Sequence, residues 1–358
     1  MNKFHSLAVA QVQRETRDAI AVTFTVPEAL RAQFRYTQGQ HLTLRADIDG
    51  EEVRRSYSIC SAVQDDRLRI AIKRVPGGRF SGWANEHLAP GQQLDVMPPS
   101  GHFNLPLDPV QARHYVAFAA GSGITPILSI IKTTLLSEPH SRFTLFYGNR
   151  ASGTVLFKEE LEDLKDRFME RFNLCFILSR EQQDIELFNG RIDAAKVEAL
   201  LTQWIDPADI DAAFICGPHA MMEAVHSALR AHGIAPERIR RELFATSIPA
   251  AAAPRHDHEA PGQHDCEVTV IQDGRVHSFS LEKNRDSLLD AALAQGVELP
   301  YSCKGGVCST CRCKLVEGEV DMDVNFALED YEVARGFILT CQSFPVSDRL
   351  VLDFDQET

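Results

Sequence analysis

The sequence predicts a multidomain protein: an antiparallel β-barrel, a doubly wound α/β domain and a small cysteine-rich domain. Three observations indicate this. The first hundred residues contain short, alternating apolar stretches, strands and helices alternate from Arg113 onward, and five of the nine cysteines lie in the last 56 residues. The length of 358 residues agrees, because a single hydrophobic core rarely grows beyond about 250–300 residues.

Composition narrows the class of protein. The apolar fraction of 44% and the charged fraction of 24% are typical of globular proteins. The net charge of −13 disfavours a nucleic-acid partner, because phosphate contacts need clustered Lys and Arg. No apolar run approaches the ~20 residues of a membrane helix, and the polar start, Met1 to Ser6, has no apolar signal segment behind it. We therefore expect a cytoplasmic protein without a membrane partner.

Residues 1–106 are predicted to form the barrel. Turn pairs such as Asp49-Gly50 and Pro90-Gly91 separate the apolar stretches, and Phe80 to Leu88 is expected to be helical. Six short strands with one helical interruption are typical of a small antiparallel barrel. The expected strands are Leu7 to Val12, Ala19 to Val26, His41 to Ala46, Ser56 to Ala62, Arg67 to Val75 and Gln93 to Met97.

Residues 107–245 are predicted to form a parallel sheet covered by helices. Strands that alternate with helices indicate a doubly wound fold, and continuous apolar strands indicate burial on both faces. The expected strands are His114 to Ala120, Phe143 to Tyr147, Leu174 to Leu178, Ala213 to Cys216 and the extended Arg240 to Phe244. The expected helices are Pro126 to Leu136, Phe157 to Phe168, Ala194 to Trp204 and Ala220 to His232.

An Ala/Pro-rich linker is predicted over residues 246–264, which show no amphipathic period. Its histidines, His256, His258 and His264, are interpreted as solvated because no flanking element fixes their geometry. The following segment, 265–358, carries 18 acidic and 8 basic residues, so most of the net negative charge is there. This charge indicates docking on a basic surface or, alternatively, only a contribution to solubility.

The cysteine spacing in the third domain predicts a 2Fe–2S centre. Cys303-x4-Cys308-x2-Cys311, followed by Cys341, matches the plant-type pattern of four thiolate ligands. The intervening Lys304 to Val307 contains two glycines, which allow the backbone to wrap closely around inorganic sulfide. A structural zinc site would normally use two closely spaced cysteine pairs, and Cys341 has no such neighbour. The fifth thiol, Cys313, is expected to be a small buried hydrophobe.

The whole of residues 265–358 resembles plant-type ferredoxin. The resemblance includes the apolar helix Ser287 to Ala294 before the cysteines and Leu339-Thr340-Cys341-Gln342 after them. It implies an α+β, β-grasp-like domain whose cluster is held by Cys303, Cys308, Cys311 and Cys341.

Motifs in the barrel segment indicate a flavin site. Arg55-Ser56-Tyr57-Ser58 lies on an expected strand, and Gly77-Gly78-Arg79-Phe80-Ser81 opens a helix whose amides suit a pyrophosphate. With Gly101-His102-Phe103, these stretches resemble the ferredoxin–NADP reductase superfamily. The resemblance implies FAD, with Arg55 at the flavin phosphates, Tyr57 on the isoalloxazine ring and Ser58 near its reactive nitrogen. Gly78 and Ser81 would then hold the pyrophosphate. Without the other motifs, Arg55 and Tyr57 would be ordinary strand residues.

Motifs in the α/β segment indicate a nicotinamide site. Gly121-Ser122-Gly123-Ile124-Thr125-Pro126 lies between an expected strand and helix, the context that dinucleotide binding requires. In the superfamily pattern, Gly121, Gly123, Gly217 and Pro218 shape the site, Thr125 and Cys216 flank the nicotinamide, and Phe244 lies near the flavin. Cys216 could otherwise be plain core.

Cofactor selectivity is assigned to three residues after two of the strands. Ser179 and Arg180 resemble a pair that recognises a 2′-phosphate, with Arg150 as a helper. This favours NADPH over NADH, although Arg180 could also be a surface arginine. Ser58 and Cys216 are the catalytic candidates. None of these groups is a general acid or base, so we expect positioning and cofactor chemistry to carry the reaction.

Together, the three domains form an electron relay. A nicotinamide gives two electrons at once, a cluster accepts one at a time, and a flavin can do both. The stretches HSLAVA, PGGRFS, AAGSGITP, YGNR, AFICGP and LPYSCKGGVCSTCRCK resemble the reductase subunits of ring-1,2-phenylacetyl-CoA epoxidases. This resemblance implies a di-iron oxygenase partner. The alternatives are a reductase for another oxygenase, such as the FMN-dependent phthalate type, and a non-enzymatic iron–sulfur redox sensor.

Overall fold

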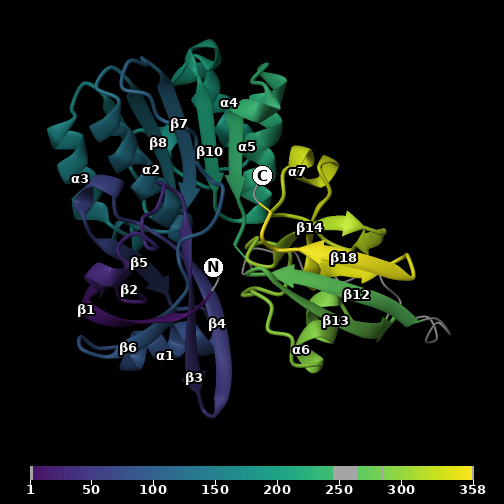
Figure 1. The fold of residues 1–358 in the computed structure, drawn as a ribbon. Helices are drawn as coiled ribbons and strands as arrows, with labels where there is room; N and C mark the ends of the chain where they lie inside the picture. The colour runs from purple at the N-terminus through teal and green to yellow at the C-terminus, as the bar shows by residue number, and fades with distance from the viewer. Residues whose placement is uncertain (1–2, 245–264, 284, 357–358) are drawn as a thin grey trace. The chain divides into compact units, whose positions relative to one another are not determined.

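The computed structural model describes residues 3–244, 265–283 and 285–356. These fall into two compact units: the larger holds residues 4–244, and the smaller holds the described residues from 265 onward together with Lys3 (Figure 1). The predicted linker, 246–264, lies outside the described residues. Among the residues that are described, no helix is both long and apolar enough to cross a membrane.

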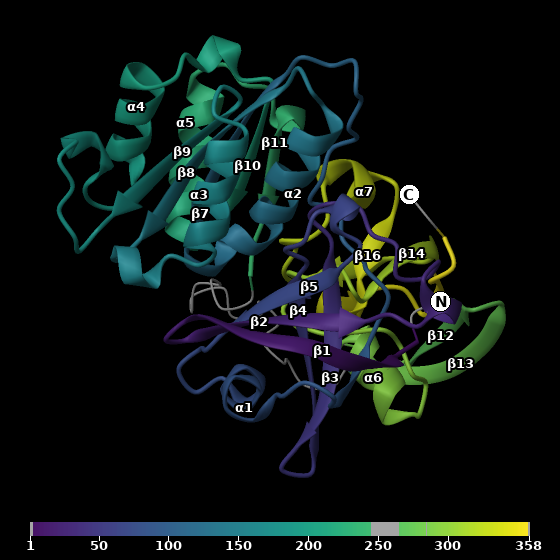
Figure 2. The ribbon, with the colours of Figure 1, turned by 90° about the vertical axis from the view of Figure 1, so that its left-hand side faces the viewer.

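An antiparallel six-stranded sheet opens the larger unit (Figure 2). Its order is β4-β3-β6-β1-β2-β5, and the isolated bridge Ile59–Ile70 joins its two ends into a barrel. Leu7, Val22, Leu44 and Val96 fill the interior. The strands are β1 (His5–Thr16), β2 (Ala19–Thr25), β3 (His41–Ile48), β4 (Glu51–Ser58), β5 (Leu68–Lys73) and β6 (Gln93–Val96), with helix α1 (Arg79–His87) after β5. The predicted barrel is confirmed.

Strand β4 departs from the sequence prediction, which placed a strand at Ser56 to Ala62. It begins at Glu51 and ends at Ser58. Its first residues are charged and exposed apart from the buried Val53, so their apolar alternation is too weak to detect. As a result, the Arg55-to-Ser58 motif occupies the last half of the strand.

A parallel five-stranded sheet completes the larger unit, in the order β11-β10-β7-β8-β9. The strands are β7 (His114–Ala120), β8 (Arg142–Asn149), β9 (Phe172–Leu178), β10 (Ala212–Cys216) and β11 (Ile239–Glu242). The helices are α2 (Ile124–Ser137), α3 (Lys158–Arg167), α4 (Ala194–Gln203) and α5 (His219–Ala231). Aromatic residues such as Tyr115, Phe143 and Phe214 fill the core between sheet and helices. The doubly wound fold is confirmed.

The strand order creates a switch point between β7 and β10. The chain moves outward from β7 to β9 and then returns to the other side of β7. Right-handed connections therefore place α2 and α3 on one face and α4 and α5 on the other. Sheets of this kind bind ligands beyond the carboxyl ends of the strands at the switch point. The ends of β7 and β10 are therefore the expected nucleotide site.

The smaller unit has the α+β architecture predicted for it (Figure 1). Its main sheet has the order β13-β12-β18-β14-β16, and α6 packs its buried Leu288 and Ala292 into the core. The elements are β12 (Asp265–Gln272), β13 (Arg275–Glu282), α6 (Leu288–Ala294), β14 (Arg312–Glu317), β15 (Val320–Met322), α7 (Asp330–Ala334), β16 (Phe337–Leu339), β17 (Ser343–Pro345) and β18 (Arg349–Asp353). Cys313 on β14 is 1% exposed, so its predicted place in the core is confirmed.

Candidate functional site

The carboxyl end of β4 holds the predicted flavin residues. Arg55 is exposed, Tyr57 is half-buried and Ser58 is buried. The ring of Tyr57 lies 5.6 Å, centroid to centroid, from that of Phe80 on α1. Burial raises the pKa of Tyr57 well above its usual value, so the phenol stays protonated. An exposed guanidinium and a partly sheltered aromatic ring on one strand suit the phosphate and ring of a flavin nucleotide.

The start of α1 holds the predicted pyrophosphate residues. Gly78 is the residue that caps the helix. The hydroxyl of Ser81 accepts a hydrogen bond from the Val75 amide (3.1 Å) and donates one to the Gly78 carbonyl (3.3 Å). Ser81 therefore holds the turn in shape, and the helix start offers backbone amides to an anion.

The switch point brings together the segments that follow β7 and β10. Gly121, Gly123 and Thr125 follow β7, whereas Gly217 and Pro218 follow Cys216 at the end of β10. A Cβ atom on Gly123 would lie 2.1 Å from the carbonyl oxygen of Cys216, so only glycine allows this close approach. The hydroxyl of Thr125 donates to the Ser122 carbonyl (3.0 Å) and is buried with the helix start. This open, side-chain-poor turn suits a dinucleotide.

Three predicted selectivity residues meet at the ends of β8 and β9. The amide of Arg180 donates to the carbonyl of Arg150 (2.8 Å), and Ser179 is half-buried beside them. Both arginine side chains are exposed. The carboxylate of the next residue, Glu181, accepts hydrogen bonds from the amide and hydroxyl of Ser152 (2.7 and 2.9 Å). Two exposed guanidinium groups can therefore contact a phosphate, while the neighbouring Glu181 carboxylate is hydrogen-bonded to Ser152.

Sequence reasoning missed Glu242. The hydroxyl of Ser58 donates to its Oε2 atom at 3.0 Å, and Glu242 pairs with Cys216 across β10 and β11. Burial raises the pKa of Glu242 to about 8, against a smaller opposing effect of Ser58. Cys216 is fully buried, and burial raises the pKa of its thiol. Three segments therefore bring a hydroxyl, a thiol and a largely protonated carboxyl group together.

A signal for Glu242 existed in the sequence. It stands in the middle of the extended segment expected over Arg240 to Phe244, where a carboxylate is unusual in a buried sheet. Its role depends on β11 pairing with β10, which the sequence does not reveal. Phe244 is half-buried and packs against the core of the α/β sheet.

The four predicted cluster ligands lie in two pairs. The amide of Cys303 lies 3.5 Å from Cys308 Sγ. A hydrogen bond with the Cys308 thiol lowers the pKa of Cys303, and one with Cys311 lowers the pKa of Cys341. Each iron of a 2Fe–2S centre takes two protein ligands, so two pairs fit two irons.

Backbone donors surround these thiols. The Gly305 amide donates to Cys303 Sγ at 3.3 Å, and the Gly306 amide bonds the Cys341 thiol. Gly306 has φ +72°, and a Cβ atom there would lie 2.8 Å from the Val324 carbonyl oxygen. The loop therefore closes around sulfur atoms in a way that only glycine permits. Amide hydrogen bonds favour the thiolate, the form that ligates iron.

A single zinc ion fits this geometry poorly. A structural zinc site needs four ligands around one point. The two-by-two arrangement of the thiols favours the dinuclear cluster.

Comparisons with known families cover all three parts of the chain. Residues 6–105 match the oxidoreductase FAD-binding domain, residues 118–227 the oxidoreductase NAD-binding domain, and residues 270–346 the 2Fe-2S iron-sulfur cluster binding domain. The chain is 48% identical over 356 residues to one of the subunits of the 1,2-phenylacetyl-CoA epoxidase of Escherichia coli K12, covering 99% of both chains.

Two further relatives share the whole architecture. The ferredoxin reductase component of 3-ketosteroid-9-alpha-monooxygenase from Rhodococcus rhodochrous is 34% identical, with 97% of this chain and 96% of the relative covered. The solved structure of phthalate dioxygenase reductase superimposes with a TM-score of 0.57 at 26% identity, covering 98% of each chain. The chain belongs to the family of ferredoxin–NADP reductase-type oxygenase reductases with a C-terminal 2Fe–2S domain, and it transfers electrons from NAD(P)H through FAD to its cluster.

Proposed function

We propose that this protein is the NADPH-dependent reductase of a di-iron ring-1,2-phenylacetyl-CoA epoxidase. The observation that carries the proposal is the 48% identity, over nearly the full length, to a subunit of the 1,2-phenylacetyl-CoA epoxidase of Escherichia coli K12. The electron acceptor of a reductase in this family is an oxygenase. The proposal is that the oxygenase served by this chain is the di-iron epoxidase. A cytoplasmic location agrees with nine cysteines of which none is paired in a disulfide.

Each site residue has a proposed role. Arg55 neutralises the flavin phosphates, Tyr57 covers the isoalloxazine ring, and the turn at Gly78 and Ser81 receives the pyrophosphate. At the switch point, Thr125 and Cys216 flank the nicotinamide, and the other residues of the two turns shape its cradle: Gly121, Gly123, Gly217 and Pro218. Phe244 lies near the flavin.

Ser58 and Glu242 are proposed to hold a proton beside the flavin. A bound FAD supplies the change from two-electron to one-electron chemistry. With a pKa of about 8, Glu242 is mostly protonated at neutral pH, and its hydrogen bond to the Ser58 hydroxyl is 3.0 Å long. A carboxyl group with such a pKa can release and recover a proton near the working pH.

The partner is tested by reconstitution with a phenylacetyl-CoA epoxidase oxygenase complex. NADPH, oxygen and phenylacetyl-CoA are supplied, and the epoxide is quantified. With the epoxidase we expect epoxide formation coupled to NADPH oxidation. With a phthalate-type dioxygenase and its own substrate as the matched acceptor, we expect no coupled product. Rapid NADPH-dependent reduction of the protein without epoxide from a competent oxygenase would contradict the proposed partner. Negligible NADPH oxidation with any acceptor would instead favour a redox sensor.

Selectivity for NADPH is tested at Arg180. We expect Arg180→Ala to lower kcat/KM for NADPH by about 10- to 100-fold, because a charge-assisted contact to a phosphate is lost. NADH lacks this phosphate, so its kcat/KM changes by less than about twofold. Steady-state ferricyanide reduction with both nucleotides measures the ratio. An unchanged ratio, with Arg191→Ala as a surface control, would contradict the 2′-phosphate role.

Electron delivery to the partner is expected to depend on salt. The acidic 265–358 segment favours encounter with a basic surface, and exposed charges are screened as ionic strength rises. We expect kcat/KM for oxygenase reduction to fall about tenfold between low and high salt. Ferricyanide, itself an anion, is the control, and its rate does not fall. Equal salt dependence of the two acceptors would contradict electrostatic docking.

A further inference from the structure

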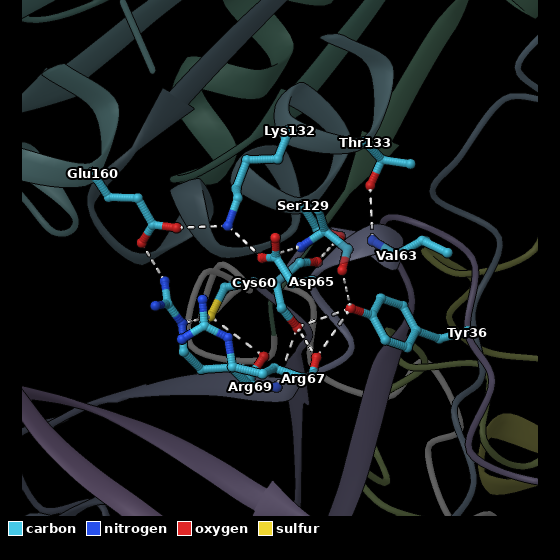
Figure 3. A network of polar contacts seen from close by, with 12 residues as sticks. Tyr36, Cys60, Val63, Asp65, Arg67, Arg69, Ser129, Lys132, Thr133 and Glu160 are labelled. Atoms are coloured by element: carbon cyan, nitrogen blue, oxygen red, sulfur yellow. Dashed lines mark hydrogen bonds and ion pairs between the residues drawn. The ribbon is translucent and has the colours of Figure 1, made fainter. Parts of the chain in front are cut away.

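A charged network lies between the barrel and the α/β sheet, within the larger unit (Figure 3). Lys132 on α2 contacts Asp65 of the barrel and, at 2.8 Å, Glu160 on α3. Glu160 in turn pairs with Arg69 on β5. Arg69 also bonds the buried Cys60 thiol (3.4 Å). The network contains two cations and two carboxylates, and each carboxylate contacts at least one cation.

Helix α2 presents a polar stripe to the same barrel segment. Ser129 Oγ donates to the Ser61 carbonyl (2.7 Å), and Thr133 Oγ1 accepts from the Val63 amide (3.2 Å). Figure 3 shows Ser129 between Lys132 and Thr133 on the side of α2 that faces this segment. The spacing i, i+3, i+4 places all three side chains on one face of a helix that is mostly apolar and almost entirely buried. Figure 3 shows them pointing from α2 towards the barrel.

The barrel side of the network is itself held in place. The hydroxyl of Tyr36 donates to the Ala62 carbonyl (2.6 Å) and bonds Ser61 Oγ (2.9 Å). Within the 59–69 segment, the Asp65 carboxylate also accepts from the Ala62 amide (3.0 Å). The loop that meets α2 is therefore fixed from both sides.

Buried ion pairs of this kind contribute little to net stability, because desolvation offsets most of the attraction. They do enforce one arrangement, since any shift leaves a charge unpaired. Burial alone would raise the pKa of Glu160, but Arg69 and Lys132 outweigh it and lower that pKa. The contact with Lys132 likewise outweighs burial and lowers the pKa of Asp65, so both carboxylates are charged at neutral pH, and the network resists sliding of α2 over the barrel.

Both ends of this contact reach a proposed cofactor site. The barrel segment begins at Ile59, directly after Ser58 at the flavin. On α2, Thr125 at the nicotinamide precedes Ser129 by one helical turn. We propose that the Asp65–Lys132–Glu160–Arg69 network, with Ser129 and Thr133, is a positioning device that sets the start of α2, and hence the nicotinamide, against the flavin.

This inference rests on the proposed placement of the two cofactors and is independent of the oxygenase partner. Electron transfer between two stacked rings depends steeply on their geometry, and a misplacement of about 1 Å can cost on the order of a hundredfold in rate. The network residues themselves touch neither cofactor site. They act through the helix.

The test compares Glu160→Gln with Glu159→Gln, an exposed neighbour on the same helix. Stopped-flow absorbance follows flavin reduction at saturating NADPH, and the long-wavelength charge-transfer band reports stacking of nicotinamide on flavin. We expect E160Q to reduce the rate about tenfold and to weaken the band, with the NADPH dissociation constant within about twofold. E159Q behaves as wild type. Lys132→Met mimics E160Q, and Lys132→Arg restores most of the rate.

Each outcome is decisive. If E160Q and K132M lower the melting temperature but leave both the flavin reduction rate and the charge-transfer band unchanged, the network is only structural and the proposal is wrong. Should the variants that remove a charge fail to fold, Ser129→Ala removes one hydrogen bond between α2 and the barrel without unpairing a charge. The same two readouts then decide. A wild-type protein whose flavin is not reduced by NADPH would contradict the proposed function instead.

Discussion

Replacing Cys308 with serine is expected to abolish the visible absorbance of the cluster and to reduce electron delivery to the oxygenase by at least about a hundredfold. A serine hydroxyl is a poor ligand for iron, and Cys308 is one member of the Cys303–Cys308 pair. Reduction of ferricyanide by NADPH stays within about twofold of wild type, because ferricyanide can take electrons from the flavin.

The matched control is Cys313→Ala. This thiol lies two residues beyond Cys311, is equally buried and faces the core of the same unit. Absorbance and electron paramagnetic resonance after dithionite reduction count the clusters in both variants. We expect a full cluster content in C313A and none in C308S. The reverse pattern would show that the four ligands are wrongly assigned, and loss of ferricyanide reduction in C308S would contradict the linear relay.

The second large effect is expected at Glu242. Because burial raises its pKa to about 8, the folded protein holds this proton across neutral pH, whereas an unfolded chain releases it near pH 4.5. We therefore expect the wild-type rate of flavin reduction to fall as the pH rises, with an apparent pKa near 8, because the protonated carboxyl group is lost. In Glu242→Gln this transition disappears, and the rate at pH 7 falls about a hundredfold, at the low end of general acid–base effects.

Stability should follow the same titration. A raised carboxyl pKa means that the native state binds more protons than the unfolded state between about pH 4.5 and 8. Stability relative to E242Q therefore falls as pH rises through this window. Thermal unfolding at several pH values measures it, with the exposed Glu237→Gln as control. A rate transition near pH 8 that persists in E242Q belongs to another group.

Ser58 provides a further check on this pair. If Ser58 and Glu242 act as a unit, the double variant S58A/E242Q should be about as slow as the slower single variant, because neither group can act without the other. Rates that multiply would indicate two independent roles. The 3.0 Å hydrogen bond between them predicts the first result.

Local patterns in the sequence were sufficient for the features set by neighbouring residues. The proposed cluster ligands Cys303, Cys308 and Cys311 share one loop, and the turn after β7 directly joins a strand to a helix. Contacts made over long separations were not predictable. Glu242 gains its place only because β11 pairs with β10, and Ser58 reaches it from 184 residues away.

The polar stripe on α2 shows the same limit. The sequence reveals that Ser129, Lys132 and Thr133 interrupt an apolar helix, but their partners lie in a barrel loop about 70 residues earlier. Strand β4 was misplaced for a different reason. Charged residues on an edge strand conceal the alternation, so the burial of Val53 alone does not define its start.

The contact between Gly123 and the Cys216 carbonyl constrains any attempt to redesign this enzyme for another electron donor. Even a methyl group at position 123 would collide with the backbone at the end of β10. The shape of the proposed nicotinamide site therefore cannot be changed by substitution at position 123. Arg150, Ser179 and Arg180 stand on the ends of other strands, and their side chains can be exchanged without moving the backbone. A variant that uses a cheaper or artificial dinucleotide is best sought there.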